Sequence, residues 1–165
     1  MKSPHLWSVS SPYLYSVLSK VFVDGKMADC YLTTMGIRSI DFDTNKGFLL
    51  NGQPFKLKGV CLHHDLGPIG AAVNVAALKR QLRLLKEMGS NAIRTSHNPP
   101  SREFLQLTDS MGFVVQVEAF DEWKVAKNLN GYHLYFDEWA EKDLRAMIRR
   151  DRNHPSVIMW SIGNE

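Results

Sequence analysis

The chain has 165 residues, 44% of them hydrophobic, and its 20 basic and 17 acidic side chains leave a formal charge of +3 at neutral pH. These values are typical of about one globular domain. They give little support for nucleic-acid binding, because the basic residues are dispersed apart from Arg149, Arg150 and Arg152. No apolar run is long enough to span a membrane, so we expect neither nucleic acid nor membrane as a partner.

The cellular compartment stays undecided at the level of sequence. The N-terminus lacks the apolar core of a signal peptide. The two cysteines, Cys30 and Cys61, fall in separate strand-like segments and form neither a disulfide framework nor a metal motif.

The first 44 residues have the pattern of β-strands. Residues 13–23 alternate in part, Asp24-Gly25 is a strong hairpin turn, and residues 27–33 are expected to return as the second strand. Residues 37–42 alternate as a third strand. Three strands enclose too little apolar surface to make an independent domain.

From residue 45 onward the pattern changes to strand–helix repeats. Residues 47–54 contain two turn signals and predict a small hairpin. The strands expected after it are 55–62, 91–95, 113–117 and 157–160, and the helices between them start near Asn74, Pro100 and Asp137 and end near Gly89, Gly112 and Arg150. This order indicates a parallel α/β sheet with four strand–helix steps, half of the eight that a closed α/β barrel needs.

Polar side chains follow each of the four predicted parallel strands. They are His63 and Asp65, then His97, then Glu118, and finally Asn164 and Glu165. In α/β barrels the reactive groups lie at the carboxyl ends of the strands, so these six residues are the candidate site.

The run from Asp151 to Glu165 resembles the acid/base signature of family 2 glycoside hydrolases, which include β-galactosidases, β-glucuronidases and β-mannosidases. Residues 91–99 resemble the other signature of that family, with Asn98 where an aromatic residue is common. The resemblance implies a fold class: residues 1–44 as the last strands of an immunoglobulin-like β-sandwich, and residues 45–165 as the N-terminal half of a TIM (β/α)8 barrel.

The resemblance also implies roles. Glu165 is expected to be the general acid/base and Asn164 to contact the sugar 2-hydroxyl, while His63, His97 and Glu118 line the sugar pocket. The implied activity is that of a retaining glycoside hydrolase acting on terminal β-D-galactosides or related β-glycosides. The family's nucleophile is a Glu on a later strand with no counterpart here, so we expect the chain to be inactive alone.

Several alternatives stay open. Asp65 is expected either to contact the sugar or to cap the following loop. Glu118 is a geometric substitute for the nucleophile, although Val117 stands where the family commonly has Asp. The long loop over residues 119–136 carries Trp123, Tyr132, Tyr135 and Phe136, which form either a substrate wall or a hydrophobic anchor. Some family members bind Mg²⁺ through a Glu and a His here; Glu122 matches the Glu, but Lys124 replaces the His, and we predict no metal or other cofactor.

Two competing functions are a non-catalytic carbohydrate-binding or scaffold fragment and a different barrel hydrolase. The expected partner is a β-linked oligosaccharide or glycoside. A half-barrel also has unpaired edge strands. We therefore expect the chain to form a homo-oligomer, to pair with a complementing remainder of the parent enzyme, or to fold poorly alone.

Overall fold

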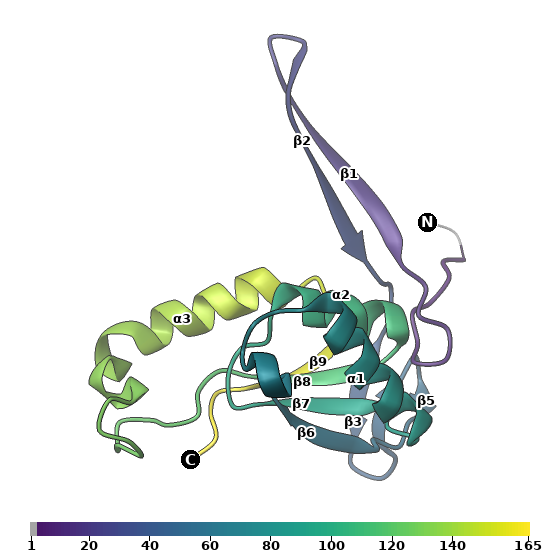
Figure 1. Cartoon of the computed structure of the whole chain (residues 1–165). Helices are drawn as coiled ribbons and strands as arrows, with labels where there is room; N and C mark the ends of the chain where they lie inside the picture. The colour runs from purple at the N-terminus through teal and green to yellow at the C-terminus, as the bar shows by residue number, and fades with distance from the viewer. Residues whose placement is uncertain (1–2) are drawn as a thin grey trace.

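The computed structural model describes residues 3–165, and its most exposed part is a long antiparallel hairpin. Strand β1 (Tyr15–Val23) pairs with β2 (Lys26–Met35) through the predicted turn, where Asp24 and Gly25 have φ values of 50° and 76°. Left-handed backbone at both central residues suits the twist of a two-residue hairpin. The hairpin projects away from the rest of the chain (Figure 1). Both predicted strands are therefore confirmed, with slightly longer bounds for the second.

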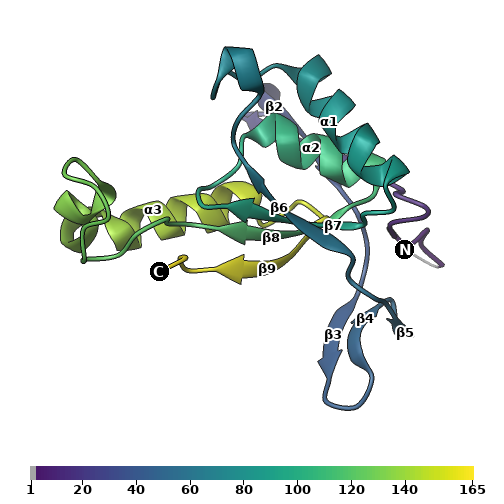
Figure 2. The ribbon, with the colours of Figure 1, turned by 60° about the horizontal axis from the view of Figure 1, so that its bottom comes forward.

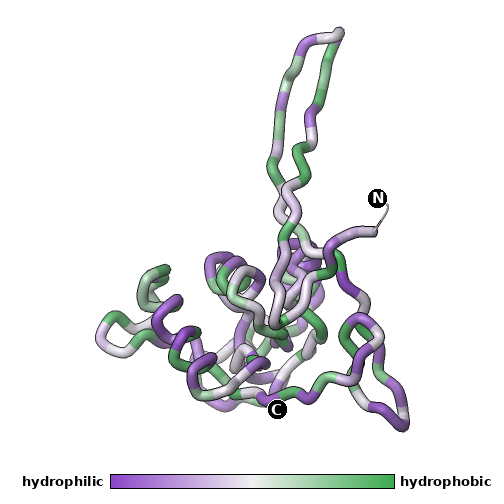
Figure 3. The backbone as a smooth tube through the Cα atoms, turned by 90° about the vertical axis from the view of Figure 1, so that its right-hand side faces the viewer, coloured by the Kyte–Doolittle hydropathy of each residue, from purple (hydrophilic) through white to green (hydrophobic). Residues whose placement is uncertain are grey.

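Large apolar side chains of the hairpin are exposed. The hydropathy colouring shows hydrophobic stretches along both strands (Figure 3). The exposed side chains include Leu18, Val21, Phe22, Val23, Met27, Tyr31 and Leu32. A two-stranded ribbon with this much exposed apolar surface is marginal by itself in water.

A second sheet joins the hairpin to the rest of the chain. It contains β3 (Ile40–Asp43), β4 (Gly47–Leu50) and β5 (Gln53–Pro54) in that order. The third predicted strand therefore begins at Ile40 rather than at residue 37, and it pairs with β4 and not with the hairpin. The small hairpin predicted over 47–54 is confirmed as β4 and β5. This sheet contains strands from both predicted domains, β3 before residue 44 and β4 and β5 after it. The domain boundary at residue 44 stays a prediction.

The third sheet is parallel and four-stranded, in the order β6-β7-β8-β9. Its strands are β6 (Gly59–His63), β7 (Ala92–Ser96), β8 (Val114–Glu118) and β9 (Val157–Ser161). Each strand neighbours the next in the sequence, as right-handed strand–helix repeats require. The four predicted strands are confirmed, although the first begins four residues later than expected because residues 55–58 form no strand.

Three α-helices follow the first three parallel strands. They are α1 (Val75–Glu87), α2 (Arg102–Met111) and α3 (Phe136–Asp151), with short 3-10 turns η1 (Gly67–Ile69) and η2 (Tyr132–Leu134). No helix within residues 3–165 has the length and apolar character needed to cross a membrane.

The helix ends test the capping predictions. The Asn74 side chain accepts a hydrogen bond from the amide of Ala77 at 3.0 Å, which confirms it as the N-cap of α1. Gly89 lies one residue past the C-cap of α1, which is Met88, and has a φ of 91°. Helix α2 is capped by Ser101, so Pro100 precedes the helix rather than starting it. Gly112 ends α2 in the left-handed conformation, as predicted.

Two apolar clusters hold the parallel sheet. The larger lies between the sheet and the helices, where Leu82, Phe104 and Met147 meet buried strand residues such as Val115. Helices α1 and α2 lie over this face in Figure 2. The smaller cluster joins the amino ends of the strands to β4 through Phe48 and Leu50. These clusters fix the positions of the parallel strands, and therefore of the residues at their carboxyl ends.

The residues on either side of the long hairpin contact α2 and the segment just before β9. Trp7 is fully buried and donates its indole N–H to the carbonyl of Asp109 at 2.8 Å. Arg38 donates to the carbonyl of Pro155 at 2.6 Å. A Cβ on Gly36 would lie 2.7 Å from the Pro155 ring, so the two segments approach as closely as glycine allows.

Candidate active site

Glu118, at the tip of β8, is the centre of a hydrogen-bonded group formed by three neighbouring strands. Its side chain is fully buried. Arg94 of β7 donates to both carboxylate oxygens, at 2.8 and 2.9 Å. His97 Nδ1 lies 2.7 Å from Oε1, and the Ser161 hydroxyl of β9 donates to Oε2 at 2.9 Å. Every carboxylate oxygen is therefore engaged.

The electrostatics of Glu118 follow from these contacts. Burial alone raises the pKa of a carboxyl group, because it disfavours the charged form. Hydrogen bonds from Arg94, His97 and Ser161 outweigh burial and hold the pKa of Glu118 below its ordinary value. The hydrogen bonds from Arg94 to Glu118 and to Cys61 raise the pKa of Arg94. The pair is thus charged at neutral pH, and a carboxylate committed to three donors is poorly suited to act as a nucleophile.

Arg94 also connects this group to the end of the chain. The same terminal nitrogen that donates to Glu118 lies 2.9 Å from the Asn164 side-chain oxygen. The backbone N–H of Asn164 donates to the backbone carbonyl of Phe120 at 2.9 Å. Both bonds orient Asn164, so its side-chain NH₂ faces Asp121 at 3.5 Å and Glu165 at 3.4 Å.

The two predicted histidines lie together. The rings of His63 and His97 meet edge to face, with their centroids 5.1 Å apart. His63 ends β6 and His97 follows β7 directly, so adjacent parallel strands bring them to one edge of the sheet.

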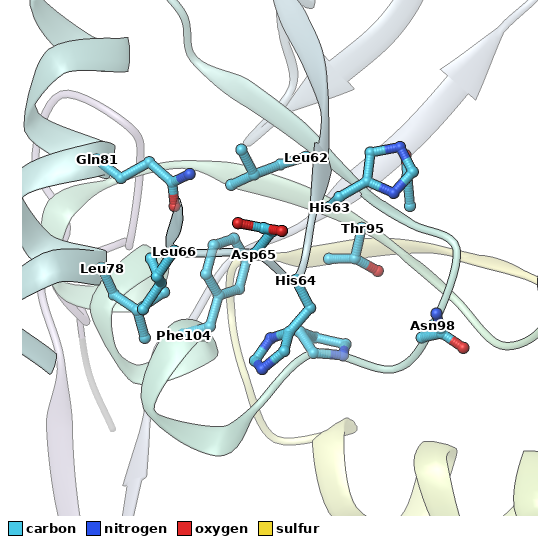
Figure 4. A pocket seen from close by; sticks show the side chains of 12 residues that line it. Leu62, His63, His64, Asp65, Leu66, Leu78, Gln81, Thr95, Asn98 and Phe104 are labelled. Atoms are coloured by element: carbon cyan, nitrogen blue, oxygen red, sulfur yellow. The ribbon is translucent and has the colours of Figure 1, made fainter. Parts of the chain in front are cut away.

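Asp65 lies apart from this group. Its carboxylate accepts a hydrogen bond from the amide of Gly67 at 2.5 Å and so caps the turn before η1. Figure 4 shows its side chain on the side of β6 that faces Gln81 of α1, while His63 points to the other side. Of the two alternatives for Asp65, the structure supports the cap; a contact with sugar stays a prediction.

Glu165 lies next to a lysine that the sequence did not single out. Lys127 donates to Asp121 at 3.0 Å and to Glu165 at 3.3 Å. Desolvation by itself lowers the pKa of Lys127, but the hydrogen bonds and charges of these two carboxylates together outweigh it, so the net shift of the pKa is upward. The polar group beside Asn164 therefore contains two carboxylates and one ammonium.

The loop between β8 and α3 is held mainly by aromatic packing. Phe120 stacks on Tyr132 with ring centroids 5.0 Å apart and meets Phe136 edge to face at 5.6 Å. Trp123 stacks on Phe136 at 6.2 Å and is partly exposed. The anchoring alternative is therefore supported for Phe120, Tyr132 and Phe136, which pack against the main core.

Glu122, the residue expected at a metal-ligand position of the family, serves the loop instead. Its buried carboxylate accepts from the amides of Lys127 at 2.8 Å and His133 at 2.9 Å, and lies 3.1 Å from the His133 ring. These backbone bonds lower the pKa of Glu122 to about 2. Lys124 pairs with Asp137. Residues 3–165 contain no cluster of three His, Cys, Asp or Glu side chains with the spacing of a metal site.

Comparison with known proteins identifies the family. Residues 43–165 match the model described as "Glycosyl hydrolases family 2, TIM barrel domain", and residues 1–38 match the model "Glycosyl hydrolases family 2". The chain belongs to glycosyl hydrolase family 2. The predicted fold class, half of a TIM barrel after the last strands of a sandwich, is confirmed.

Relatives in this family resemble the whole chain but are much longer. The β-galactosidase BoGH2A of Bacteroides ovatus is 55% identical over 165 residues, which is 100% of this chain and 19% of that protein. A putative β-glucuronidase of Formosa agariphila is 43% identical over the same length, 16% of that protein. The crystal structure of a β-glycosidase from Bacteroides vulgatus has a TM-score of 0.95 and 51% identity, covering 98% of this chain and 21% of that one.

Family membership gives the strand-tip group a chemical context. Glycosidases act through carboxyl groups that face a bound sugar ring. Within residues 3–165, Glu118 is fixed by Arg94 and His97, whereas the Glu165 carboxylate is exposed and contacts Lys127 and Asn164. Of these two glutamates, Glu165 is therefore the more accessible to a ligand.

Proposed function

We propose that residues 1–165 supply the general acid/base half of the active site of a retaining β-glycosidase. The substrates are terminal β-D-galactosides or related β-glycosides, and Glu165 is the acid/base residue. The observation that carries this proposal is the chain of contacts from Glu165 through Asn164 and Arg94 to Glu118. These contacts place the exposed carboxyl group of Glu165 beside polar side chains whose orientations are fixed.

The proposed mechanism has two proton transfers at Glu165. In the first step its carboxyl group gives a proton to the leaving glycosidic oxygen while a second carboxylate attacks the anomeric carbon. In the second step the Glu165 carboxylate takes a proton from water, and that water displaces the enzyme from the sugar. The two carboxyl groups must be about 5 to 5.5 Å apart for this retaining course.

The attacking carboxylate belongs, in this proposal, to a part of the enzyme beyond these residues. The face of the parallel sheet that points away from the helices supports this part of the proposal. Cys61 on that face is exposed, and Gln116 and Met159 beside it are only partly buried. Strands β6 and β9 each pair on one side only. The remaining strands of a barrel would cover this face and pair with both edges.

Asn164, His63 and His97 are the proposed sugar contacts. Their side chains offer amide and ring N–H donors to hydroxyl groups. Arg94 fixes the orientation of Asn164, and the Asn164 side-chain NH₂ lies between Asp121 and Glu165, where the hydroxyl group of a bound sugar could accept one of its protons. Glu118 acts in this scheme by orienting Arg94 and His97, and it has no covalent role.

Complementation tests the proposal. Purified residues 1–165 should not hydrolyse a chromogenic β-galactoside, and hydrolysis should appear when the complementary barrel half of a close relative is added. The Glu165→Gln variant should abolish the restored activity, whereas Glu87→Gln on the exposed side of α1 should not. Turnover by residues 1–165 alone, lost in Glu165→Gln, would refute the need for a second half. Binding of the sugar with no turnover after complementation would favour the non-catalytic alternative.

A further inference from the structure

The ammonium group of Lys127 is the only cation that the structure places against Glu165 within residues 3–165. Lys127 Nζ lies 3.3 Å from Glu165 Oε1 and 3.0 Å from Asp121 Oδ1. The Lys127 side chain is 28% exposed, compared with 78% for Glu165. The lysine is therefore the more fixed partner of the two.

Glu122 explains why the lysine is fixed although it belongs to a long loop. The carboxylate of Glu122 accepts the backbone amide of Lys127 itself, at 2.8 Å. It accepts the amide of His133 at the same time, so the two sides of the loop are joined through one buried group. Gly131 lies directly against that carboxylate, where an added Cβ would come within 1.9 Å of Oε1. The loop backbone at Lys127 is thus set by contacts that do not involve its side chain.

A divalent cation does not fit the same place. Both oxygens of Glu122 already accept N–H protons, and a metal would have to displace those amides from a buried carboxylate. The expected second ligand is replaced by Lys124, whose ammonium group has no lone pair to offer a metal and pairs with Asp137 instead. The positive charge beside Asp121 and Glu165 is therefore built into the chain as Lys127.

We propose that Lys127 is a positioning residue for proton transfer by Glu165. This inference rests on the proposed role of Glu165 as the acid/base. A long, exposed glutamate side chain loses rotamer freedom when it is held in one orientation, and a charge-assisted hydrogen bond offsets part of that loss. Lys127 and Asn164 supply that orientation from two sides.

The test uses the full-length enzyme that contains residues 1–165 and two aryl β-galactosides. One has a good leaving group that departs without protonation, and the other has a poor leaving group that requires it. For Lys127→Met we expect kcat/KM to fall about tenfold or more with the poor leaving group, and about twofold or less with the good one. Lys127→Arg keeps a cation and should recover most of the loss.

Lys124→Met is the matched control. Lys124 is in the same loop and is 67% exposed, but it pairs with Asp137 and not with the site. Its substitution should leave both substrates within about twofold of the wild type. Because Glu122 binds the backbone of residue 127, the Lys127 side chain can be changed while that bond stays in place. Dialysis against EDTA should not change the wild-type activity.

The outcomes separate the two proposals when Glu165→Gln is measured alongside. If Glu165→Gln keeps wild-type activity on the poor leaving group, the acid/base assignment fails. If Glu165→Gln is inactive and Lys127→Met lowers kcat/KM equally for both substrates, or for neither, only the role of Lys127 is overturned. Loss of activity in EDTA and its return with Mg²⁺ would overturn the assignment of Lys127 as the resident cation.

Discussion

Arg94 and Glu118 form a two-point ion pair across neighbouring parallel strands. Arg94 Nε and one terminal nitrogen donate to the two carboxylate oxygens at 2.8 and 2.9 Å. The register of the sheet sets Arg94 beside Gln116, so Glu118 lies two residues further along on the same face. Planar guanidinium and carboxylate groups match in this geometry, which fixes the orientation of both side chains.

Arg94→Met should disable the site while leaving the fold recognisable. It removes the donor that orients Asn164 and leaves the buried charge of Glu118 with only His97 and Ser161. We expect kcat/KM of the full-length enzyme to fall about 100-fold, as for a catalytic group misplaced by about 1 Å. Arg94→Lys keeps the charge but not the two-point geometry, so its kcat/KM should lie between those of the wild type and Arg94→Met. Wild-type kcat/KM in Arg94→Met would show that the ion pair does not organise the site.

The loop held by Glu122 should resist acid until unusually low pH. The pKa of Glu122 is about 2 in the folded chain, below the ordinary value of 4.5. A depressed pKa contributes stability that is present above pH 4.5 and is lost as the pH falls toward 2. The amide proton shift of Lys127 in NMR spectra should therefore report the titration of Glu122 as a movement near pH 2 and not near pH 4.5.

Glu122→Gln is the control for that titration. The amide does not titrate, so the movement near pH 2 should disappear in the variant. A midpoint near 4.5 in the wild type would mean that the carboxylate is not held by the two backbone amides.

Asp109→Ala should destabilise the chain more than an exposed acidic substitution. The buried Asp109 carboxylate accepts from the amide and hydroxyl of Ser156, at 3.1 and 2.6 Å, and lies 2.5 Å from His154 Nδ1. Its removal leaves buried donors without partners, which costs about 2 to 3 kcal/mol of the free energy of unfolding. Urea unfolding at fixed protein concentration measures this loss, with Asp29→Ala on the hairpin as the control. Equal stability of the two variants would contradict it.

The hairpin should make the isolated chain associate. Leu18 and Leu32 are paired across β1 and β2, and their side chains are 53% and 60% exposed. Sedimentation velocity should show dimers or larger species for residues 1–165. The double variant Leu18→Lys, Leu32→Glu should reduce them, whereas Lys20→Gln on the same strand should not. A monomer that melts cooperatively would contradict this prediction.

The parallel half of the fold could be predicted because its signals are local. Apolar runs followed by polar tips, together with Asn74 and Gly112, locate strands and helix ends within a few residues. The strand predicted over residues 37–42 is confirmed with a later start, at Ile40. An alternating pattern predicts a strand but does not say which strand pairs with it, and in the structure that partner is β4.

The candidate site was predictable only in part. His63 and Glu118 end strands, and His97 and Asn164 follow the ends of two others, so the parallel order of the sheet brings all four to one edge. Ser161 is also at a strand tip, and that position was the signal for its bond to Glu118. Lys127 gives no comparable signal, because its place depends on a loop folded around Glu122. For Asp65, sequence alone does not distinguish a turn cap from a ligand contact.

The central claim is that Glu165 exchanges the proton of the reaction. Its most direct test is the rate of the full-length Glu165→Ala variant on an activated aryl β-galactoside, with and without azide. Without the acid/base, the rate at which water attacks the glycosyl-enzyme should fall by about 10² to 10⁴-fold. Azide needs no deprotonation, so its attack should not depend on Glu165. We predict that azide restores turnover and yields the β-galactosyl azide. Wild-type turnover without azide in the folded variant, or no acceleration by azide, would contradict the assignment.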